Sequence, residues 1–241
     1  MPEQNSSSSL DVLQKFSIPL AIVLAGAFIA GAVYLSGGTL PASGQNPPSV
    51  NIKDVKITAT TPVLGDKSAP ATLAYWFDYQ CPFCKAVDVG GVPGINVEPS
   101  MPILVDEYVN TGKLRIVFKD YAFLGPDSTT AALYKHAVWE KYPDRFYEWH
   151  EAMYKAQDEE NGGFGDEESI LTLIRSLGLD ANALKALVDA KRDEYLKLIQ
   201  DDIAEGAGFG INGTPGFITG TTLIPGAEQP ATFRAVIDAQ L

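Results

Sequence analysis

The longest apolar stretch of the chain lies near its N-terminus. Residues 16–35, FSIPLAIVLAGAFIAGAVYL, contain no charged side chain, and roughly 20 such residues allow a helix to cross the hydrocarbon core of a bilayer. Because a usual signal core has only ~7 to 15 apolar residues, a retained transmembrane anchor is favoured. The alternative is a signal segment that is cleaved at Ala30-Gly31-Ala32, which resembles a signal-peptidase site.

The residues that flank this segment indicate its orientation. The short tail of residues 1–15 ends with Lys15, and the next basic residue after the segment is Lys53. Positive charge favours the cytoplasmic side of a membrane, so we expect the tail inside and the bulk of the chain outside. Residues 36–50, SGGTLPASGQNPPSV, are uncharged and rich in Gly, Ser and Pro, which predicts a flexible linker.

Beyond the linker, short apolar runs with β-branched and aromatic residues predict strands. The predicted strands are residues 71–77, 113–121, 216–220 and 222–226. The first of them, ATLAYWF, is a short apolar run with aromatic and β-branched residues, which suits a buried central strand.

Helical periodicity fills the space between the second and third strands. From Ser128 to Ile203, apolar residues recur at the spacing of one helix face. Asp180 is suited to cap one of these helices, and Pro230 to begin a last one. The order of elements predicts an α/β domain over residues 51–241 with a helical insertion at roughly residues 125–207.

Composition and charge narrow the possible partners. The chain has 241 residues, of which 46% are hydrophobic, and this is ample for a packed core. It has 18 Lys and Arg against 30 Asp and Glu, a formal net charge of -12. Such a chain repels phosphate backbones, and we find no basic stripe that would reverse this locally, so the sequence argues against a nucleic-acid partner.

The two cysteines of the chain both lie in DYQCPFCK, residues 78–85. Cys81 follows a predicted strand, and Pro82 is suited to the first helical position, so we expect Cys81 to be the N-cap of a helix. The free backbone N–H groups and the dipole there favour a thiolate. Cys84 lies about one turn further on, within reach of a disulfide but facing the interior. This asymmetry is what thiol–disulfide exchange requires.

Two other interpretations of the cysteine pair remain open but are weaker. A structural disulfide would close a very small loop and constrain the unfolded chain little. A zinc site would need two more ligands, and His136 and His150 lie far downstream without the close spacing of a zinc motif. Single histidines in amphipathic helices are usually structural, and we expect no metal site.

A family resemblance supports the redox interpretation. Residues 62–85, PVLGDKSAPATLAYWFDYQCPFCK, resemble the opening of the DsbA-like branch of the thioredoxin superfamily, where an apolar strand leads through Asp-aromatic-Gln into Cys-Pro-x-Cys. Further stretches are similar to later parts of that family in the same order: residues 112–123, 145–154, 210–220 and 224–238. The resemblance covers essentially residues 51–241 and implies a thioredoxin-like fold with an inserted helical subdomain.

The resemblance also implies roles for the residues of the motif. Cys81 would be the solvent-facing thiol that forms the mixed disulfide with substrate, and Cys84 the shielded thiol that resolves it. Pro82 and Phe83 would support the site by tuning its redox potential through the start of the helix. Such a site uses no metal and no organic cofactor.

The stretch GINGTPGFITG is implied to contain the cis-proline loop of the family. Thr214 and Pro215 would lie against the cysteine pair, with the Thr214 backbone free to bind an extended substrate segment as an added strand. Without the resemblance, a trans peptide bond would be expected, because only about 5–6% of X-Pro bonds in folded proteins are cis.

The sequence departs from the family pattern in two places. Tyr75 stands six residues before Cys81, where members often have a buried carboxylate thought to help proton transfer at the inner cysteine. Asp78 is nearer, but its place at the strand end suggests a solvated or capping role. Residues 86–102 are rich in Gly and Pro, so either the first helix is short and a loop follows, or a helix restarts near Pro102.

These observations predict a thiol:disulfide oxidoreductase, favoured as an extracytoplasmic oxidase that introduces disulfides into exported proteins. Its partners would be cysteine-containing exported proteins and a quinone-linked membrane reoxidase. The alternatives are a reductase or isomerase of the same fold, and a membrane-tethered peptide-binding or chaperone module. The expected location is the cell membrane, single-pass, with the catalytic domain outside; the alternative is a secreted or periplasmic protein after signal cleavage.

Overall fold

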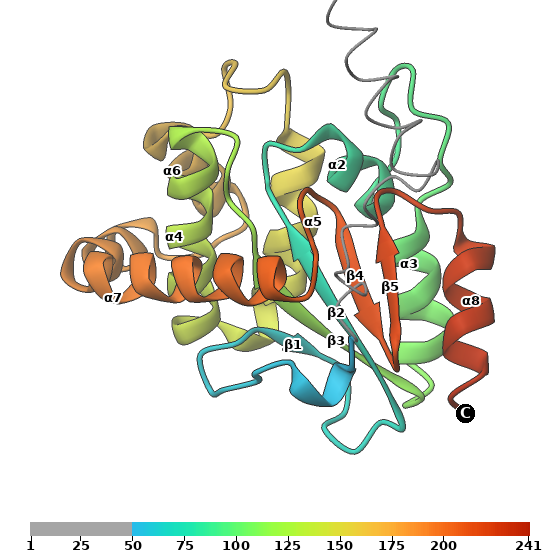
Figure 1. Ribbon diagram of the computed structural model, residues 1–241. Coiled ribbons are helices and arrows are strands. Elements are labelled where there is room, and N and C mark those ends of the chain that lie inside the picture. The colour runs from blue at the N-terminus through green and yellow to red at the C-terminus, as the bar shows by residue number, and fades with distance from the viewer. Residues whose placement is uncertain (1–49) are drawn as a thin grey trace, which may run out of the picture. The chain divides into compact units, whose positions relative to one another are not determined.

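The computed structural model describes residues 50–241 (Figure 1). The predicted tail, the predicted membrane segment and all but the last residue of the predicted linker lie outside this range. Within it, no helix combines the length and the apolar character needed to cross a membrane. The first regular element is a short 3-10 helix, η1 (Ile52–Asp54), capped by Asn51.

A five-stranded sheet with the strand order β1-β3-β2-β4-β5 lies at the centre. The strands are β1 (Val63–Leu64), β2 (Ala71–Phe77), β3 (Leu114–Asp120), β4 (Gly216–Thr219) and β5 (Thr222–Pro225). Only β2 and β3 run parallel; every other pair of neighbours is antiparallel. All four predicted strands are confirmed. The additional strand, β1, has two residues, which is too short to show an alternating pattern.

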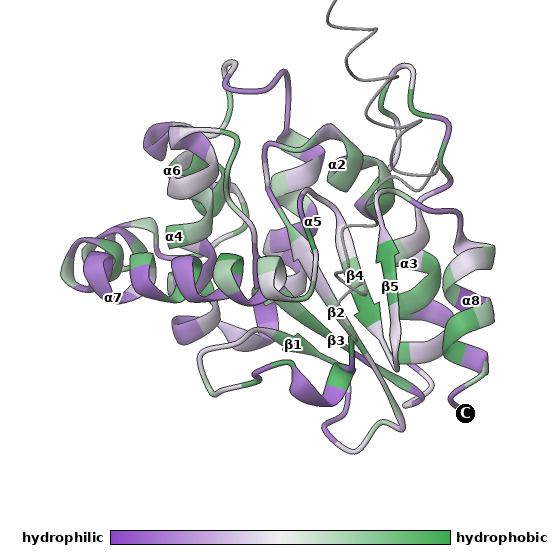
Figure 2. Cartoon of the chain, in the orientation of Figure 1, coloured by the Kyte–Doolittle hydropathy of each residue, from purple (hydrophilic) through white to green (hydrophobic). Residues whose placement is uncertain are grey.

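Four helices follow β3 and fill the region between it and β4. They are α4 (Pro126–Lys141), α5 (Phe146–Ala156), α6 (Glu167–Ser176) and α7 (Ala181–Gly208), with a 3-10 turn η3 (Pro143–Arg145) before α5. The Asp180 carboxylate accepts the backbone N–H of Ala183 at 3.0 Å, so the predicted cap of α7 is confirmed. Hydrophobic and hydrophilic residues alternate along α7 (Figure 2), as a helix with one buried face requires.

The Gly- and Pro-rich stretch after the cysteines contains both of the expected features. The helix α2 (Pro82–Asp88) is short and a loop follows it; a new helix, α3 (Ser100–Leu104), then begins and continues as a π-helical turn, η2 (Val105–Val109). The last helix, α8 (Pro230–Asp238), begins with proline as predicted. In Figure 1, α3 and α8 lie side by side next to β5, at the edge of the sheet.

Alternate residues of β2 belong to two separate hydrophobic clusters, which explains why this strand is apolar except at Thr72. Tyr75 and Phe77 belong to the larger cluster, which is shared with α2, α4 and α5. Trp76 belongs to the smaller one, where the C-terminal end of α7 covers it. The Trp76 indole packs on the backbone of Gly206 so closely that a Cβ there would lie 2.8 Å from the ring. This contact requires glycine and attaches α7 to the sheet.

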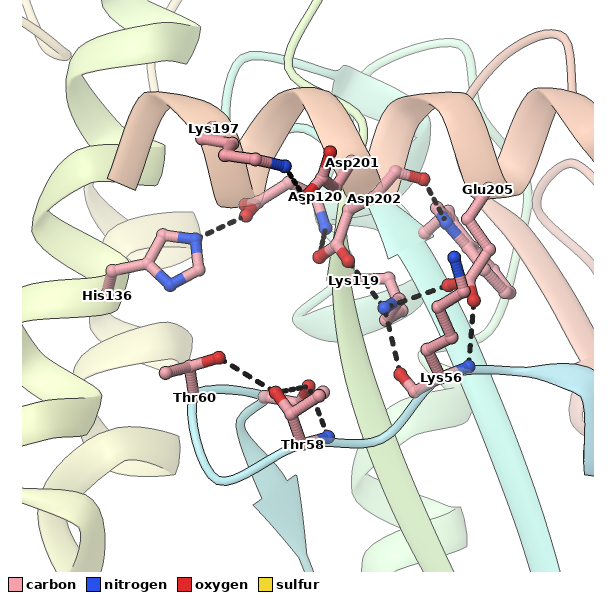
Figure 3. A network of polar contacts seen from close by, with 12 residues as sticks. Lys56, Thr58, Thr60, Lys119, Asp120, His136, Lys197, Asp201, Asp202 and Glu205 are labelled. Atoms are coloured by element: carbon pink, nitrogen blue, oxygen red, sulfur yellow. Dashed lines mark hydrogen bonds and ion pairs between the residues drawn. The ribbon is translucent and has the colours of Figure 1, made fainter. Parts of the chain in front are cut away.

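Buried charges tie the same helix to β3 (Figure 3). Lys119 is 2% exposed, and its Nζ lies 2.5 Å from Asp202 and 2.9 Å from Glu205. It also donates to the carbonyl of Lys56 at 3.1 Å. The lysine therefore links β3 to α7 and to the segment between η1 and β1.

The adjacent residue of β3 is bound to α4 in a similar way. Asp120 Oδ2 lies 2.6 Å from Lys135 Nζ and 2.8 Å from His136 Nε2. Burial would raise the pKa of Asp120, but Lys135 and His136 outweigh it and the pKa is lowered to about 2. The Asp120 carboxylate is therefore ionised and forms a buried ion pair with Lys135.

Candidate active site

The two cysteines lie where β2 ends and α2 begins. Cys81 is the N-cap of α2 and Pro82 its first residue, so the predicted helix start is confirmed. The connection from β2 is held by Gln157, at the end of α5, whose side-chain amide donates to the carbonyls of Tyr79 and Cys81 at 2.6 and 3.1 Å. Nothing in the sequence near the cysteines indicated Gln157.

Asp78 organises the loops around this connection. Its Oδ1 accepts the N–H of Gln80 at 2.9 Å, and its Oδ2 accepts those of Phe123 and Leu124 at 2.9 and 3.1 Å. The side chain acts as a cap for backbone groups, as expected, but it is buried rather than solvated. Because all three bonds are to backbone N–H groups, Asp78 positions the loop after β3 beside α2.

The loop before β4 approaches Cys81 because of the register of the sheet. Gly216 in β4 pairs with Trp76 in β2, so the residues before Gly216 reach the end of β2 from which α2 starts. The Cys81 thiol donates to the carbonyl oxygen of Thr214 at 3.3 Å. The Thr214–Pro215 peptide bond is cis, as the resemblance implied. The sheet thus unites two motifs that are distant in sequence.

The two thiols have opposite acidities. The pKa of Cys81 is lowered to about 7, chiefly because the Cys84 side chain hydrogen-bonds to it. Burial acts to raise this pKa, whereas the Thr214 side chain and the backbone N–H groups of Phe83 and Cys84 act to lower it. Burial, together with the hydrogen bond to Cys81, raises the pKa of Cys84 well above its ordinary value. At neutral pH, therefore, Cys81 is about half thiolate and Cys84 is protonated.

The surroundings of Cys81 combine shielding with apolar surface. Cys81 is only 4% exposed. The expectation that its thiol faces the solvent is therefore wrong, because the thiol lies against the Thr214–Pro215 loop. Phe83 and Phe123 are 50% and 52% exposed. A cavity of about 460 Å³ borders Gln80, Pro82 and the loop after α2, and one of about 210 Å³ borders the loop of residues 210–216.

Tyr75, at the usual position of the acid, contacts a carboxylate from elsewhere. Its hydroxyl donates to Asp88 Oδ2 at 2.7 Å, and Asp88 Oδ1 lies 2.9 Å from His150 Nε2. All three side chains are buried. Sequence reasoning missed Asp88, although it follows Cys84 by one helical turn and this spacing could have indicated it.

The remaining titratable residues do not gather into a metal site. Among residues 50–241, no cluster of three or more His, Cys, Asp or Glu side chains has the arrangement that a metal ion needs. His136 contacts Asp120 at one end of the insertion, whereas His150 contacts Asp88 beside α2. Each of the two therefore hydrogen-bonds to a different buried carboxylate.

Comparison with known sequences identifies relatives of this chain. Residues 57–239 match the sequence profile of a family described as thioredoxin. A Bacillus anthracis protein named "Probable disulfide bond formation protein D" is 22% identical over 211 residues, which cover 87% of this chain and 92% of the relative. "Disulfide bond formation protein D" of Bacillus subtilis is 32% identical over 96 residues, 40% of this chain and 39% of the relative.

Solved structures share the fold. BdbD from Bacillus subtilis, in its oxidised form, superposes with a TM-score of 0.66 at 23% identity, covering 81% of this chain and 98% of that one. The thiol-disulfide exchange protein alpha-DsbA2 from Wolbachia pipientis gives a TM-score of 0.65 at 25% identity, covering 79% and 90%. The helical insertion is thus part of a known architecture.

Proposed function

Because this chain belongs to the thioredoxin family, in its DsbA-like branch, and is a thiol:disulfide oxidoreductase with a Cys-x-x-Cys pair, we propose that it works in the oxidising direction. The observation that carries this proposal is the lowered pKa of Cys81, about 7 against an ordinary 9.0. A stabilised thiolate favours the reduced enzyme, and an enzyme with a stable reduced form is a strong oxidant. The name "disulfide bond formation protein D" of its relatives supports the same direction.

The reaction proceeds by two thiol–disulfide exchanges. A substrate thiolate attacks the Sγ of Cys81 in the Cys81–Cys84 disulfide; the S–S bond breaks and Cys84 leaves. A second substrate thiolate then attacks the substrate sulfur of the mixed disulfide and displaces Cys81 as a thiolate. Two electrons pass from the substrate to the cysteine pair, and the substrate gains a disulfide.

The neighbouring loops hold the substrate in this proposal. The backbone of Thr214, before Pro215, binds an extended segment next to its cysteine. Phe83, next to Pro82, and Phe123, in the loop after β3, offer apolar contacts, since each is about half exposed. Pro82 sets the start of α2 and, with it, the environment of the Cys81 sulfur.

The topology of the whole chain belongs to the proposal as well. Residues 51–241 form the catalytic domain, with the helical insertion at roughly residues 125–207, held outside the cytoplasm by an anchor at residues 16–35 and a linker at residues 36–50. Its substrates are exported proteins with cysteines, and a quinone-linked membrane protein returns it to the disulfide form.

The reduction potential of the Cys81–Cys84 pair tests the direction. The pair is equilibrated in glutathione buffers of graded composition, and the oxidised fraction is measured by alkylation and mass spectrometry. A value near or above about -150 mV is expected for an oxidase. A value near about -270 mV, as in thioredoxin, would reject the oxidising direction and favour a reductase.

A Cys81→Ser variant separates exchange chemistry from peptide binding. It is expected to abolish disulfide formation in a cellular assay, with the variant present at wild-type abundance. Unchanged activity of this variant would instead support a peptide-binding or chaperone role. A matched Ser128→Ala variant, which alters a buried hydroxyl in α4, is expected to retain activity.

A further inference from the structure

Cys84 must exchange a proton during catalysis, although it is completely buried. When it attacks a mixed disulfide on Cys81 it must first lose its thiol proton, and when it leaves the intramolecular disulfide it must gain one. Burial raises the pKa of Cys84 well above its ordinary value. A proton acceptor within hydrogen-bond reach, directly or through one further group, is therefore required.

Two other buried carboxylates, those of Asp78 and Asp120, interact with groups other than the cysteines. Asp78 accepts three backbone N–H groups. Asp120 is ion-paired with Lys135 at 2.6 Å and hydrogen-bonded to His136 at 2.8 Å. Neither carboxylate hydrogen-bonds to Tyr75 or to a cysteine thiol among the described residues.

Asp88 is differently placed, because it hydrogen-bonds to Tyr75, whose side chain acts on the Cys84 thiol. The Tyr75 side chain acts to lower the pKa of Cys84, which places its hydroxyl close to that thiol. It also donates to Asp88 Oδ2 at 2.7 Å. Beyond Asp88, Oδ1 lies 2.9 Å from His150 Nε2, and His150 Nδ1 lies 2.9 Å from the Tyr79 hydroxyl.

The direction of each hydrogen bond follows once Asp88 is taken as ionised and His150 as neutral. With Asp88 ionised, Tyr75 and His150 Nε2 both donate to it, and Tyr79 donates to His150 Nδ1. The Tyr75 hydroxyl has one proton, which points to Asp88, so its oxygen is free to accept the proton of the Cys84 thiol. The phenol itself is a poor base at neutral pH, but it can pass a proton on.

We propose that Asp88 is the proton acceptor and donor for Cys84 and that Tyr75 transfers the proton between them. As Cys84 attacks the Cys81 sulfur, its thiol proton moves to Tyr75 Oη and the Tyr75 proton moves to Asp88 Oδ2. The new S–S bond forms and the substrate thiolate leaves from Cys81. In the opposite direction the leaving Cys84 sulfur takes a proton from Tyr75, which regains one from Asp88.

The surroundings of Asp88 allow it to take up this proton. The titratable groups that face the Tyr75–Asp88 pair are Cys84 from α2, Tyr79 from the connection before it, and Tyr147, His150 and Tyr154 from α5. Within residues 50–241, neither a lysine nor an arginine forms an ion pair with Asp88. In this respect Asp88 differs from Asp120, which has Lys135 as a partner.

The proposal rests on the exchange reaction but not on its physiological direction, and the resolution step tests it. The reduced full-length enzyme is mixed with excess oxidised glutathione and quenched with acid after milliseconds to seconds. Mass spectrometry then measures the Cys81–glutathione mixed disulfide and the Cys81–Cys84 disulfide. The decay of the mixed disulfide gives the rate of attack by Cys84 between pH 6 and pH 8.

Asp88→Asn and Tyr75→Phe are the test variants, because both retain the shape of the side chain. Each is expected to resolve the mixed disulfide about ten- to a hundredfold more slowly at pH 7. The wild-type rate is expected to vary little with pH, whereas the rates of the variants rise about tenfold per pH unit because hydroxide must then remove the proton. Alkylation of Cys81 in the reduced variants should stay within about twofold of wild type.

Tyr108→Phe is the matched control. Tyr108 is also a buried tyrosine, and its hydroxyl donates to the Asp238 carboxylate at 2.7 Å, but it contacts neither cysteine. It should leave the rate and its pH dependence unchanged. If Asp88→Asn does not fold, Tyr75→Phe decides alone.

Two results would overturn the relay. One is resolution by folded Asp88→Asn and Tyr75→Phe at the wild-type rate with the wild-type pH dependence. The other is a wild-type enzyme that forms no mixed disulfide with glutathione, which would reject the exchange chemistry itself and is distinguishable from the first result.

Discussion

Replacing Cys84 by alanine is expected to raise the pKa of Cys81, whereas replacing it by serine is expected to leave that pKa near 7. The largest contribution to the lowered pKa is the hydrogen bond from the Cys84 side chain. Serine retains a donor at this position and alanine does not. Either variant leaves one cysteine in the chain, so a thiol reagent reports on Cys81 alone.

The magnitude follows from the pKa of Cys81. A shift from 9.0 to about 7 corresponds to roughly 2.7 kcal/mol in favour of the thiolate. A hydrogen bond to a charged group contributes about 1.5–3 kcal/mol, but the N–H groups of Phe83 and Cys84 also act on Cys81. We therefore expect alanine to raise the pKa by about one unit, to about 8.

The assay is alkylation by iodoacetamide between pH 5 and pH 10, followed by mass spectrometry. At pH 7 the thiolate fraction is expected to fall from about a half to about a tenth in Cys84→Ala, so alkylation becomes about fivefold slower. Cys84→Ser should react as fast as the wild type. Equal midpoints for the serine and alanine variants would refute the reasoning and assign the low pKa to Thr214 and the start of α2.

Further predictions concern stability. Gly206→Ala is expected to destabilise the fold by about 1–3 kcal/mol in urea unfolding because the new methyl group overlaps Trp76. Gly208→Ala, with open space around its Cβ position, should be neutral or slightly stabilising, and an equal loss in both variants would contradict the contact. Lys135→Met should cost roughly 3 kcal/mol or more, because it leaves the buried Asp120 carboxylate without its lysine. The folded pKa of Asp120 is about 2 and the unfolded one about 3.9, so its contribution is present above about pH 4 and is lost as the pH falls towards 2. Unfolding in urea at pH 6 and pH 3 should show this loss in the wild type but not in Lys135→Met, and equal losses in both proteins would assign the acid sensitivity to other groups.

The parts of the fold that the sequence predicted depend on local patterns. β2 is apolar at every position except Thr72 because both of its faces are buried, and its bounds agree with the prediction. Pro82 and Asp180 mark helix starts for reasons that operate within one turn. The order of the motifs then carried the family resemblance.

The parts that the sequence did not predict depend on contacts between distant residues. Gln157 reaches the carbonyl of Tyr79 across 78 positions, and no local pattern marks a glutamine as a ligand of that loop. Asp88 contacts Tyr75 across 13 positions, because the strand and the helix lie next to each other in the fold. The near-complete burial of Cys81 likewise depends on a loop from the other end of the domain.

The approach of Thr214 to Cys81 has a consequence for biogenesis. The two residues are 133 positions apart, and the four helices of the insertion lie between them in sequence. During synthesis, α2 and both thiols emerge long before the loop that covers them, because chains are made from the N-terminus. Until β4 pairs with β2, the newly made enzyme carries exposed thiols and is open to the oxidants and disulfides of its compartment. Since it has no third cysteine, the one disulfide that it can form within itself is the native one, and such exposure cannot produce an internal mispairing.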